Sequence, residues 1–189
     1  MQLTNKLVAI ADSIREQIQS TELMTIDVMP PNIDSISGHE IEDAILTHAL
    51  TGTYINPRIE TVEAYSFYGN ADLTAVGLDS VARISGNTFY NCTNLEAVHA
   101  PICVAMFTQC FRNCSSLVAL ILEEIDRVPQ ITNLNIFQGS AIEAGTGYIY
   151  VPDNLVDTIK NSSPFSGIAT QIKGASEIPQ AYKDLFNIQ

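Results

Sequence analysis

The chain has 189 residues, with 21 acidic and nine basic side chains, and its formal net charge at pH 7 is −12. This acidic balance lacks the clustered basic footprint of a nucleic-acid-binding protein, and it argues against binding to an anionic membrane. Hydrophobic residues make up 46% of the chain, which suffices for a folded core, and no stretch approaches the roughly 20 apolar residues of a membrane span.

Residues 1–36 are expected to form an N-terminal helical module. One apolar stripe at helical spacing runs along it: Leu3, Leu7, Ile10, Ile14 and Ile18. Two interpretations stay open, an amphipathic helix that packs on its own domain or a docking helix that joins copies into a homo-oligomer. The apolar run is shorter than the roughly 7–15 residues of a signal-peptide core. We therefore expect the protein in the cytoplasm when made, and in a virion or outside the cell after lysis.

Residues 37–53 are expected to form an N-terminal capping helix. Ser37 and Glu40 have the spacing of a capping box, in which each side chain bonds a backbone N–H near the other residue. Gly52 is placed to end this helix. A stack of repeats exposes an apolar end unless another segment covers it, and this helix is the predicted cover.

Residues 54–152 carry a repeat of 22 residues. Five apolar columns keep this phase: Phe67, Phe89, Phe111; Leu73, Leu95, Leu117; Val76, Val98, Leu120; Ile59, Val81, Cys103, Ile125; and Val62, Ile84, Met106, Val128. A period of 22 lies in the window of roughly 20–29 residues typical of leucine-rich repeats. One such unit buries too little surface to fold alone, so it must stack on its neighbours. We expect an α+β solenoid, a right-handed leucine-rich-repeat-like stack of about four 22-residue rungs with helical caps.

Within a rung, the pattern predicts a short strand at residues 95–98, a turn at Pro101 and a helical turn over residues 87–92 that directs Phe89 inward. The period slips after Val128, so residues 129–134 are predicted to be a bulging loop.

Residues 148–151 are expected to be a terminal strand, followed by a C-terminal cap and tail at residues 153–189. A helix is predicted to start at Pro152 and Asp153. Three apolar residues then mark a second cap segment, Phe165, Ile168 and Ile172, and three in the tail can dock on the fold, Tyr182, Leu185 and Phe186.

The four cysteines, Cys92, Cys103, Cys110 and Cys114, lack the spacing of a zinc site. Cys92 and Cys114 share one repeat position, and adjacent rungs are close enough for a disulfide. The absence of a secretion signal favours free thiols over this bridge.

Two blocks of the repeat, residues 88–95 (TFYNCTNL) and 110–117 (CFRNCSSL), resemble the BspA-like leucine-rich repeats. The pattern of that family runs Ala-Phe, two residues, Cys, two residues, Leu. The resemblance covers about residues 55–152, and residues 147–160 are similar to the segment that closes such arrays. It implies a curved solenoid with a narrow sheet on one side, and it supplies no catalytic residues.

A second resemblance concerns residues 5–14 and 24–30. They are similar to a small module in proteins of phages and prophages of gut bacteria, which commonly precedes repeats of this kind. The resemblance implies a role in a phage tail or adsorption apparatus.

Catalytic, metal and cofactor sites are not expected. The three histidines, His39, His48 and His99, stand in no Ser-His-Asp order and in no H-E-x-x-H string, and no glycine-rich phosphate loop is present. Glu123 and Glu124 could suggest paired carboxylates for glycoside cleavage, but adjacent residues on a strand face opposite sides. We interpret them as a solvated turn.

Binding is the better functional hypothesis, because outward positions of successive rungs line up. Tyr68, Tyr90 and Arg112 form one column, and Glu96 and His99 belong to two further outward rows. Tyr and Arg are enriched at binding hot spots, although ordinary edge residues would give the same pattern. The expected partner is a protein or glycan on a bacterial or host surface.

Three function classes remain. The first is a phage- or prophage-encoded tail or adsorption component, and the alternative is a BspA-like cell-surface adhesion protein of the bacterium itself. The third class, a glycan-acting enzyme, has no positive feature in the sequence.

Overall fold

The structure, a computed structural model, describes residues 52–189. The helices predicted in residues 1–51 lie outside the described residues. The chain divides into two compact units, Met1–Leu50 and Thr51–Gln189, and the description that follows concerns the second unit.

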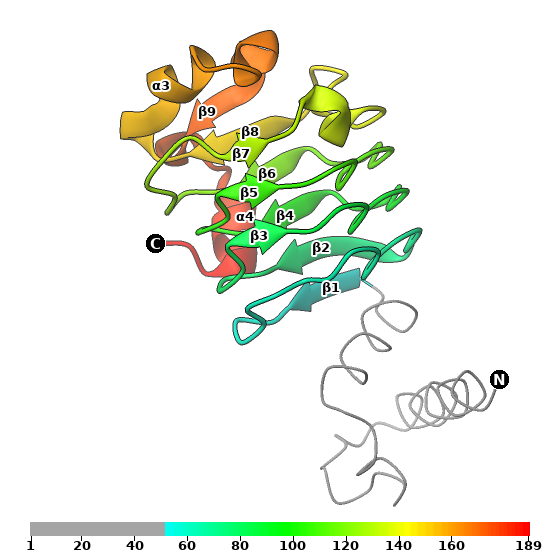
Figure 1. Cartoon of the computed structure of the whole chain (residues 1–189). Helices are drawn as coiled ribbons and strands as arrows, with labels where there is room; N and C mark the ends of the chain where they lie inside the picture. The colour runs from blue at the N-terminus through cyan, green and yellow to red at the C-terminus, as the bar shows by residue number, and fades with distance from the viewer. Residues whose placement is uncertain (1–51) are drawn as a thin grey trace, which may run out of the picture. The chain divides into compact units, whose positions relative to one another are not determined.

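Two parallel sheets form this unit (Figure 1). The larger one, sheet A, has the strand order β1-β2-β4-β6-β8-β9, and the smaller one, sheet B, has the order β3-β5-β7. Sheet A comprises β1 (Gly52–Ile55), β2 (Leu73–Gly77), β4 (Ala97–His99), β6 (Ala119–Ile121), β8 (Tyr148–Val151) and β9 (Ile172–Gly174). Sheet B comprises β3 (Arg83–Ile84), β5 (Ala105–Met106) and β7 (Gln130–Ile131).

The strand register of sheet A reproduces the period of the sequence. Val76 pairs with Val98, and Val98 pairs with Leu120. These side chains are buried between the two sheets, whereas the residues on either side of each point to the opposite, outward face of sheet A. The sheet has six strands, so it extends beyond the predicted stack of about four rungs at both ends.

The phenylalanine column is a continuous stack of rings in the core. The ring centroids of Phe67 and Phe89 lie 4.8 Å apart, and those of Phe89 and Phe111 lie 5.4 Å apart. Phe137 extends the stack at 5.9 Å from Phe111. All four rings are buried, which confirms the predicted alignment of the first three.

Residues 87–92, which precede β4, form a tight turn and not the predicted helical turn. Asn87 and Asn91 both have positive φ, at 57° and 62°, and a helix cannot continue through such residues. The turn still directs Phe89 inward, as predicted. Cys92 follows, and its thiol donates a hydrogen bond to the carbonyl of Phe67 in the preceding rung.

All four cysteines are buried free thiols, as predicted. Burial raises the pKa of Cys92 to about 12 and that of Cys103 to about 11. Because the thiolate is the reactive form, these side chains are apolar filling of the rungs.

The insertion that interrupts the 22-residue period after Val128 has a different structure from the predicted loop. Residues 129–134 are not a simple loop, because they contain β7, in which Ile131 pairs with Met106. Ile131, and not Val128, therefore continues the column of Met106. A 3-10 helix, η3 (Leu134–Phe137), then returns Phe137 to the ring stack.

The predicted strand at residues 148–151 is β8, but it is not terminal because β9 pairs with it. Between them lie η4 (Asp153–Leu155), α3 (Val156–Lys160) and η5 (Phe165–Gln171). The helix start at Asp153 is confirmed, and Phe165 and Ile168 are buried. At the other end of the sheet, Gly52 has a φ of 74° but begins β1, so the strand starts inside the range predicted to be helical.

The chain ends with η6 (Ala175–Glu177) and α4 (Gln180–Phe186). Figure 1 shows α4 crossing beside β4 on the outward face of sheet A. Phe186 is buried there, whereas Leu185 is 38% exposed. The tail therefore docks through Phe186 and not through Leu185.

Candidate functional site

The three residues predicted as a column, Tyr68, Tyr90 and Arg112, lie in contact on successive rungs. The rings of Tyr68 and Tyr90 are stacked, with centroids 5.1 Å apart and an interplanar angle of 8°. The Arg112 guanidinium lies over the Tyr90 ring at 5.8 Å from its centroid. Tyr68 is 44% exposed. We call these three residues the Tyr–Arg column.

Backbone turns hold the column in place. Each member follows a buried phenylalanine of the ring stack and precedes a turn residue with positive φ. Asn113 donates a side-chain hydrogen bond of 2.8 Å to Asn91, which ties two of these turns together. The buried Nε of Arg112 has no hydrogen-bond partner. The column is therefore ordered by the core beneath it and retains one unused donor.

Tyr65 adds a fourth aromatic residue that the sequence analysis missed. Its ring centroid lies 5.7 Å from that of Tyr68, and it is an exposed side chain. Its φ is 69°, in a region that costs a bulky residue free energy. The signal was available in the sequence, because the same repeat position holds Asn87 in the next rung.

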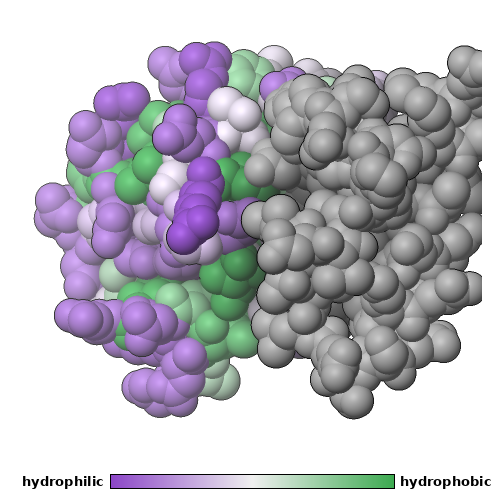
Figure 2. Space-filling view, turned by 90° about the horizontal axis from the view of Figure 1, so that it is seen from below, coloured by the Kyte–Doolittle hydropathy of each residue, from purple (hydrophilic) through white to green (hydrophobic). Residues whose placement is uncertain are grey.

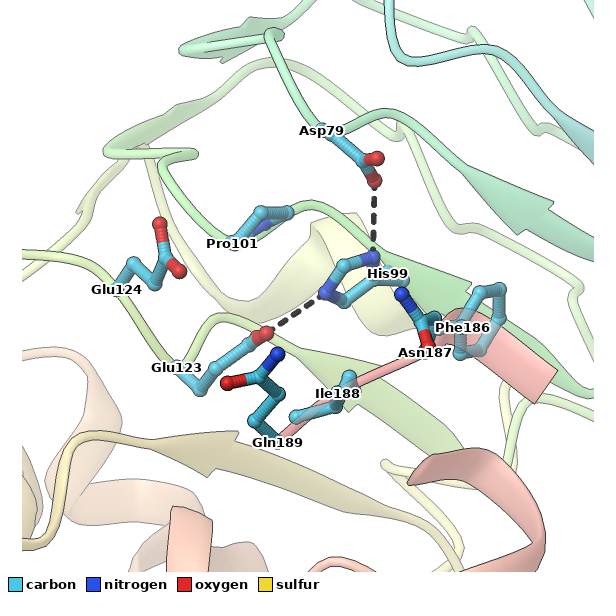
Figure 3. Close-up of a pocket in the computed structure, with 9 residues that line it drawn as sticks. All are labelled: Asp79, His99, Pro101, Glu123, Glu124, Phe186, Asn187, Ile188 and Gln189. Atoms are coloured by element: carbon cyan, nitrogen blue, oxygen red, sulfur yellow. Dashed lines mark hydrogen bonds and ion pairs between the residues drawn. The ribbon is translucent and has the colours of Figure 1, made fainter. Parts of the chain in front are cut away.

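His99 lies at the end of β4, at the centre of a second cluster (Figure 3). Its Nδ1 lies 3.0 Å from Asp79 Oδ1, and its Nε2 lies 2.7 Å from Glu123 Oε1. The ring of Phe186 stacks on the imidazole with centroids 5.0 Å apart. His99 is only 5% exposed.

This location corrects two expectations. The side chain of His99 projects from the outward face of sheet A, as predicted. However, α4 covers it, so the outward row that contains His99 is not a free surface. Glu123 is not a fully solvated turn residue, because its side chain is only 12% exposed and bonds His99. Glu124, its neighbour, is exposed as predicted.

A pocket of about 450 Å³ opens beside His99. Asp79, Pro101, Glu123 and Glu124 line one side, and the last four residues of the chain line the other. No lysine or arginine is among its lining residues. The pocket thus presents carboxylates beside the apolar ring of Phe186, and a cationic group is the ligand chemistry that it fits.

His99 is poorly placed to act as a general base. A general base needs a free nitrogen or oxygen within hydrogen-bond reach of the proton that it removes, and both ring nitrogens of His99 already face carboxylates. The pocket lining also contains no Ser, Thr, Cys or Lys as a nucleophile. Within residues 52–189, no three His, Cys, Asp or Glu side chains converge as metal ligands.

The five predicted site residues fall into two groups. Tyr68, Tyr90 and Arg112 come together in one column, whereas His99 and Glu96 belong to β4 and its approach. Glu96 is exposed. Its negative charge adds to the effect of burial in raising the pKa of Tyr182 in α4. The sequence analysis missed Asp79 and Phe186 as partners of His99.

The surface at the β1 end of the sheets is mixed in character. Figure 2 views the described residues from below, where hydrophobic patches alternate with hydrophilic side chains. Ile55 of β1 is one exposed hydrophobic residue of the unit. Among the described helices, none has the length and apolar character needed to cross a membrane.

Comparison with protein families matches residues 39–167 to the BspA type leucine rich repeat region, in six copies. Comparisons with curated proteins and with solved structures found no match. The matched range covers most of the chain, and it contains every strand of the two parallel sheets except β9. The repeats of this family are typical of non-catalytic binding proteins. The chain therefore belongs to the BspA-type leucine-rich repeat family.

Proposed function

We propose that this chain is a non-enzymatic binding protein that contacts its partner through the Tyr–Arg column. The observation that carries the proposal is the stacking of Tyr68 on Tyr90, with Arg112 over the second ring. Side chains fixed before binding lose little conformational freedom when the partner arrives. Tyrosine and arginine are also the residue types that dominate binding hot spots.

The backbone of Tyr65 supports the same surface. A tyrosine with φ near 69° costs about 1–2 kcal/mol relative to a residue that tolerates this region. Backbone strain of this kind is concentrated at functional sites. Tyr65 lies against Tyr68 of the Tyr–Arg column, which supports a binding role for this surface.

A protein partner fits the column better than a glycan. Sugar rings bind aromatic side chains face to face, but Tyr90 has one face against Tyr68 and the other against Arg112. At Tyr90 the ring edge and the guanidinium of Arg112 remain for contact, and these suit the carbonyls and carboxylates of a protein surface.

The finer biological role that we propose is that of a phage- or prophage-encoded tail or adsorption component. It rests on the resemblance of residues 5–14 and 24–30. The alternative, a bacterial BspA-like surface adhesion protein, rests on the repeat family. The identity of neighbouring genes separates the two, because tail, portal and lysis genes would accompany the first role and not the second.

For the fold, we propose a right-handed leucine-rich-repeat solenoid closed by helical segments. Parallel strands of one sheet joined by a crossover are right-handed in nearly all proteins, and successive strands of sheet A are joined in this way.

Attachment of the fluorescently labelled full-length protein to intact cells of gut bacteria tests the binding proposal. We expect the triple variant Tyr68→Ala, Tyr90→Ala, Arg112→Ala to lose at least about 90% of attachment, as removal of several hot spots predicts. The matched control is Arg83→Ala with Phe107→Ala, which removes another exposed cation–π pair.

The control should attach like the wild type, and both variants should melt cooperatively. Treating the cells with protease should abolish attachment, whereas periodate oxidation of glycans should not. Unchanged attachment of the folded triple variant would refute binding through the column.

A further inference from the structure

Residues 175–189 form a strap across the outward face of sheet A, on a surface separate from the Tyr–Arg column. The strap buries Ile178 and Phe186, and Tyr182 and Ile188 are partly buried against the same cluster. Four consecutive strands supply the face beneath it, through Ala75, Ala97, Ala119, Ile121 and Tyr150. The short side chains of the alanines let a helix pack close to the backbone of the sheet.

The strap is held by apolar and ring contacts. Among the described residues, no hydrogen bond or ion pair joins residues 178–189 to sheet A. The polar anchors lie earlier, where Ser176 bonds Asp153 and Glu177 pairs with Lys173. The segment beyond Glu177 can therefore leave the sheet without breaking a polar contact to it, whereas the four strands beneath it, β2, β4, β6 and β8, each pair with two neighbouring strands.

The end of the strap leaves the acidic pocket unfilled. Glu123 Oε2 is buried and has no hydrogen-bond partner, although Oε1 of the same carboxylate bonds His99. Asn187, Ile188 and Gln189 line the pocket from the strap side and supply no positive charge. In Figure 3, Gln189 lies beside Glu123.

We propose that the strap is a displaceable occupant and that the face beneath it binds an amphipathic helix of a protein partner. That helix carries two aromatic residues four positions apart, as Tyr182 and Phe186 are, and a lysine or arginine within the next turn. Its aromatic residues take the places of Tyr182 and Phe186. Its cationic group enters the pocket and forms an ion pair with Glu123, which the uncharged side chains of Asn187, Ile188 and Gln189 cannot form.

A labelled peptide of residues 178–189 carrying Gln189→Arg serves as the probe, titrated by fluorescence anisotropy into the full-length protein. Phe186→Ala in the protein weakens the strap, so we expect it to raise the affinity for the peptide by about tenfold or more. The control is Leu185→Ala on the same helix, whose side chain is exposed, and it should bind as the wild type does.

The pocket is tested by the same titration. The peptide that keeps Gln189 should bind the Phe186→Ala protein about tenfold more weakly than the arginine peptide, because it cannot pair with a buried carboxylate. Glu123→Gln should remove this difference. Equal affinity of the arginine peptide for the wild type, Phe186→Ala and Leu185→Ala proteins would overturn the proposal, as would equal affinity of the two peptides for Phe186→Ala.

Hydrogen exchange of the wild-type protein tests displacement without any substitution. Amides of residues 182–188 should exchange about a hundredfold faster than those of β4 and β6, through an opening that leaves the sheet folded. Exchange of both regions at one rate would mean that the strap opens only on global unfolding, and would overturn the proposal. A concentration-dependent dimer that Phe186→Ala abolishes would also overturn it, by identifying a second copy as the occupant.

Discussion

At the scale of single residues, the turns show how the sequence sets the backbone. Two positions in each rung have positive φ, and they repeat with the same period as the core columns: Tyr65, Asn87 and Gln109, then Gly69, Asn91 and Asn113. Asparagine and glycine tolerate this region better than other residues. Tyr65 and Gln109 are the exceptions, and Tyr65 lies at the edge of the proposed binding surface.

Replacing Tyr65 by the residue of the next rung should separate stability from binding. We expect Tyr65→Asn to raise the free energy of unfolding by about 0.5–1 kcal/mol, because relief of the backbone outweighs the loss of an exposed ring contact. Attachment to cells should fall. Urea denaturation measures the first effect, with Tyr65→Phe as a control that keeps the strained backbone, and a loss of stability in Tyr65→Asn would show that the strain is absent.

At the scale of elements, the strap and sheet A meet at Tyr150. Desolvation by burial raises the pKa of Tyr150 to about 12, and the nearby Tyr182 and Tyr148 add to the effect. Burial raises the pKa of Tyr182 as well. An unfolded tyrosine loses its proton near pH 10, so the folded state keeps a proton that the unfolded chain releases.

The stabilisation linked to Tyr150 is therefore complete below pH 10 and is lost as the pH rises through about 12. Urea unfolding at pH 9 to 12 should show a falling free energy of unfolding in the wild type. Tyr150→Phe cannot ionise, and its stability should fall less steeply over this range. Identical slopes would mean that Tyr150 titrates as an exposed tyrosine does.

The elements also show what periodicity can predict. Leu73, Leu95 and Leu117 are buried as their spacing indicated, and the strand at residues 148–151 has the predicted bounds. These features are local, because each depends on a rung and its neighbours. Ile131 was missed because the insertion before it shifts the phase, and β9 because no repeat marks it.

The cluster around His99 was predictable in part. Asp79, Pro101 and Glu123 occupy one repeat position on three successive rungs. Stacking of the rungs therefore places one carboxylate on each side of His99, from the rung before it and the rung after it. Phe186 was not predictable in this way, because residues 175–189 carry no repeat phase. A segment distant in sequence decides which outward rows are covered, and the sequence of the rungs alone does not contain that information.

At the scale of the whole unit, one rule connects the core to the surface. Stacking in register places Phe67 over Phe89 inside and Tyr68 beside Tyr90 outside, because adjacent residues of one turn face opposite ways. The same rule aligns His99 between the carboxylates of its neighbours. The proposed binding surfaces therefore exist only if the rungs stack with a spacing of 22 residues.

Nuclear Overhauser effects between selectively labelled aromatic rings measure this register directly in solution. We predict ring-to-ring contacts from Phe67 to Phe89 and from Phe89 to Phe111, with centroids 4.8 and 5.4 Å apart. A parallel contact should join Tyr68 to Tyr90. Contacts that pair these rings in another order, or no contact between residues 22 positions apart, would contradict the stacked-rung structure and both binding surfaces built on it.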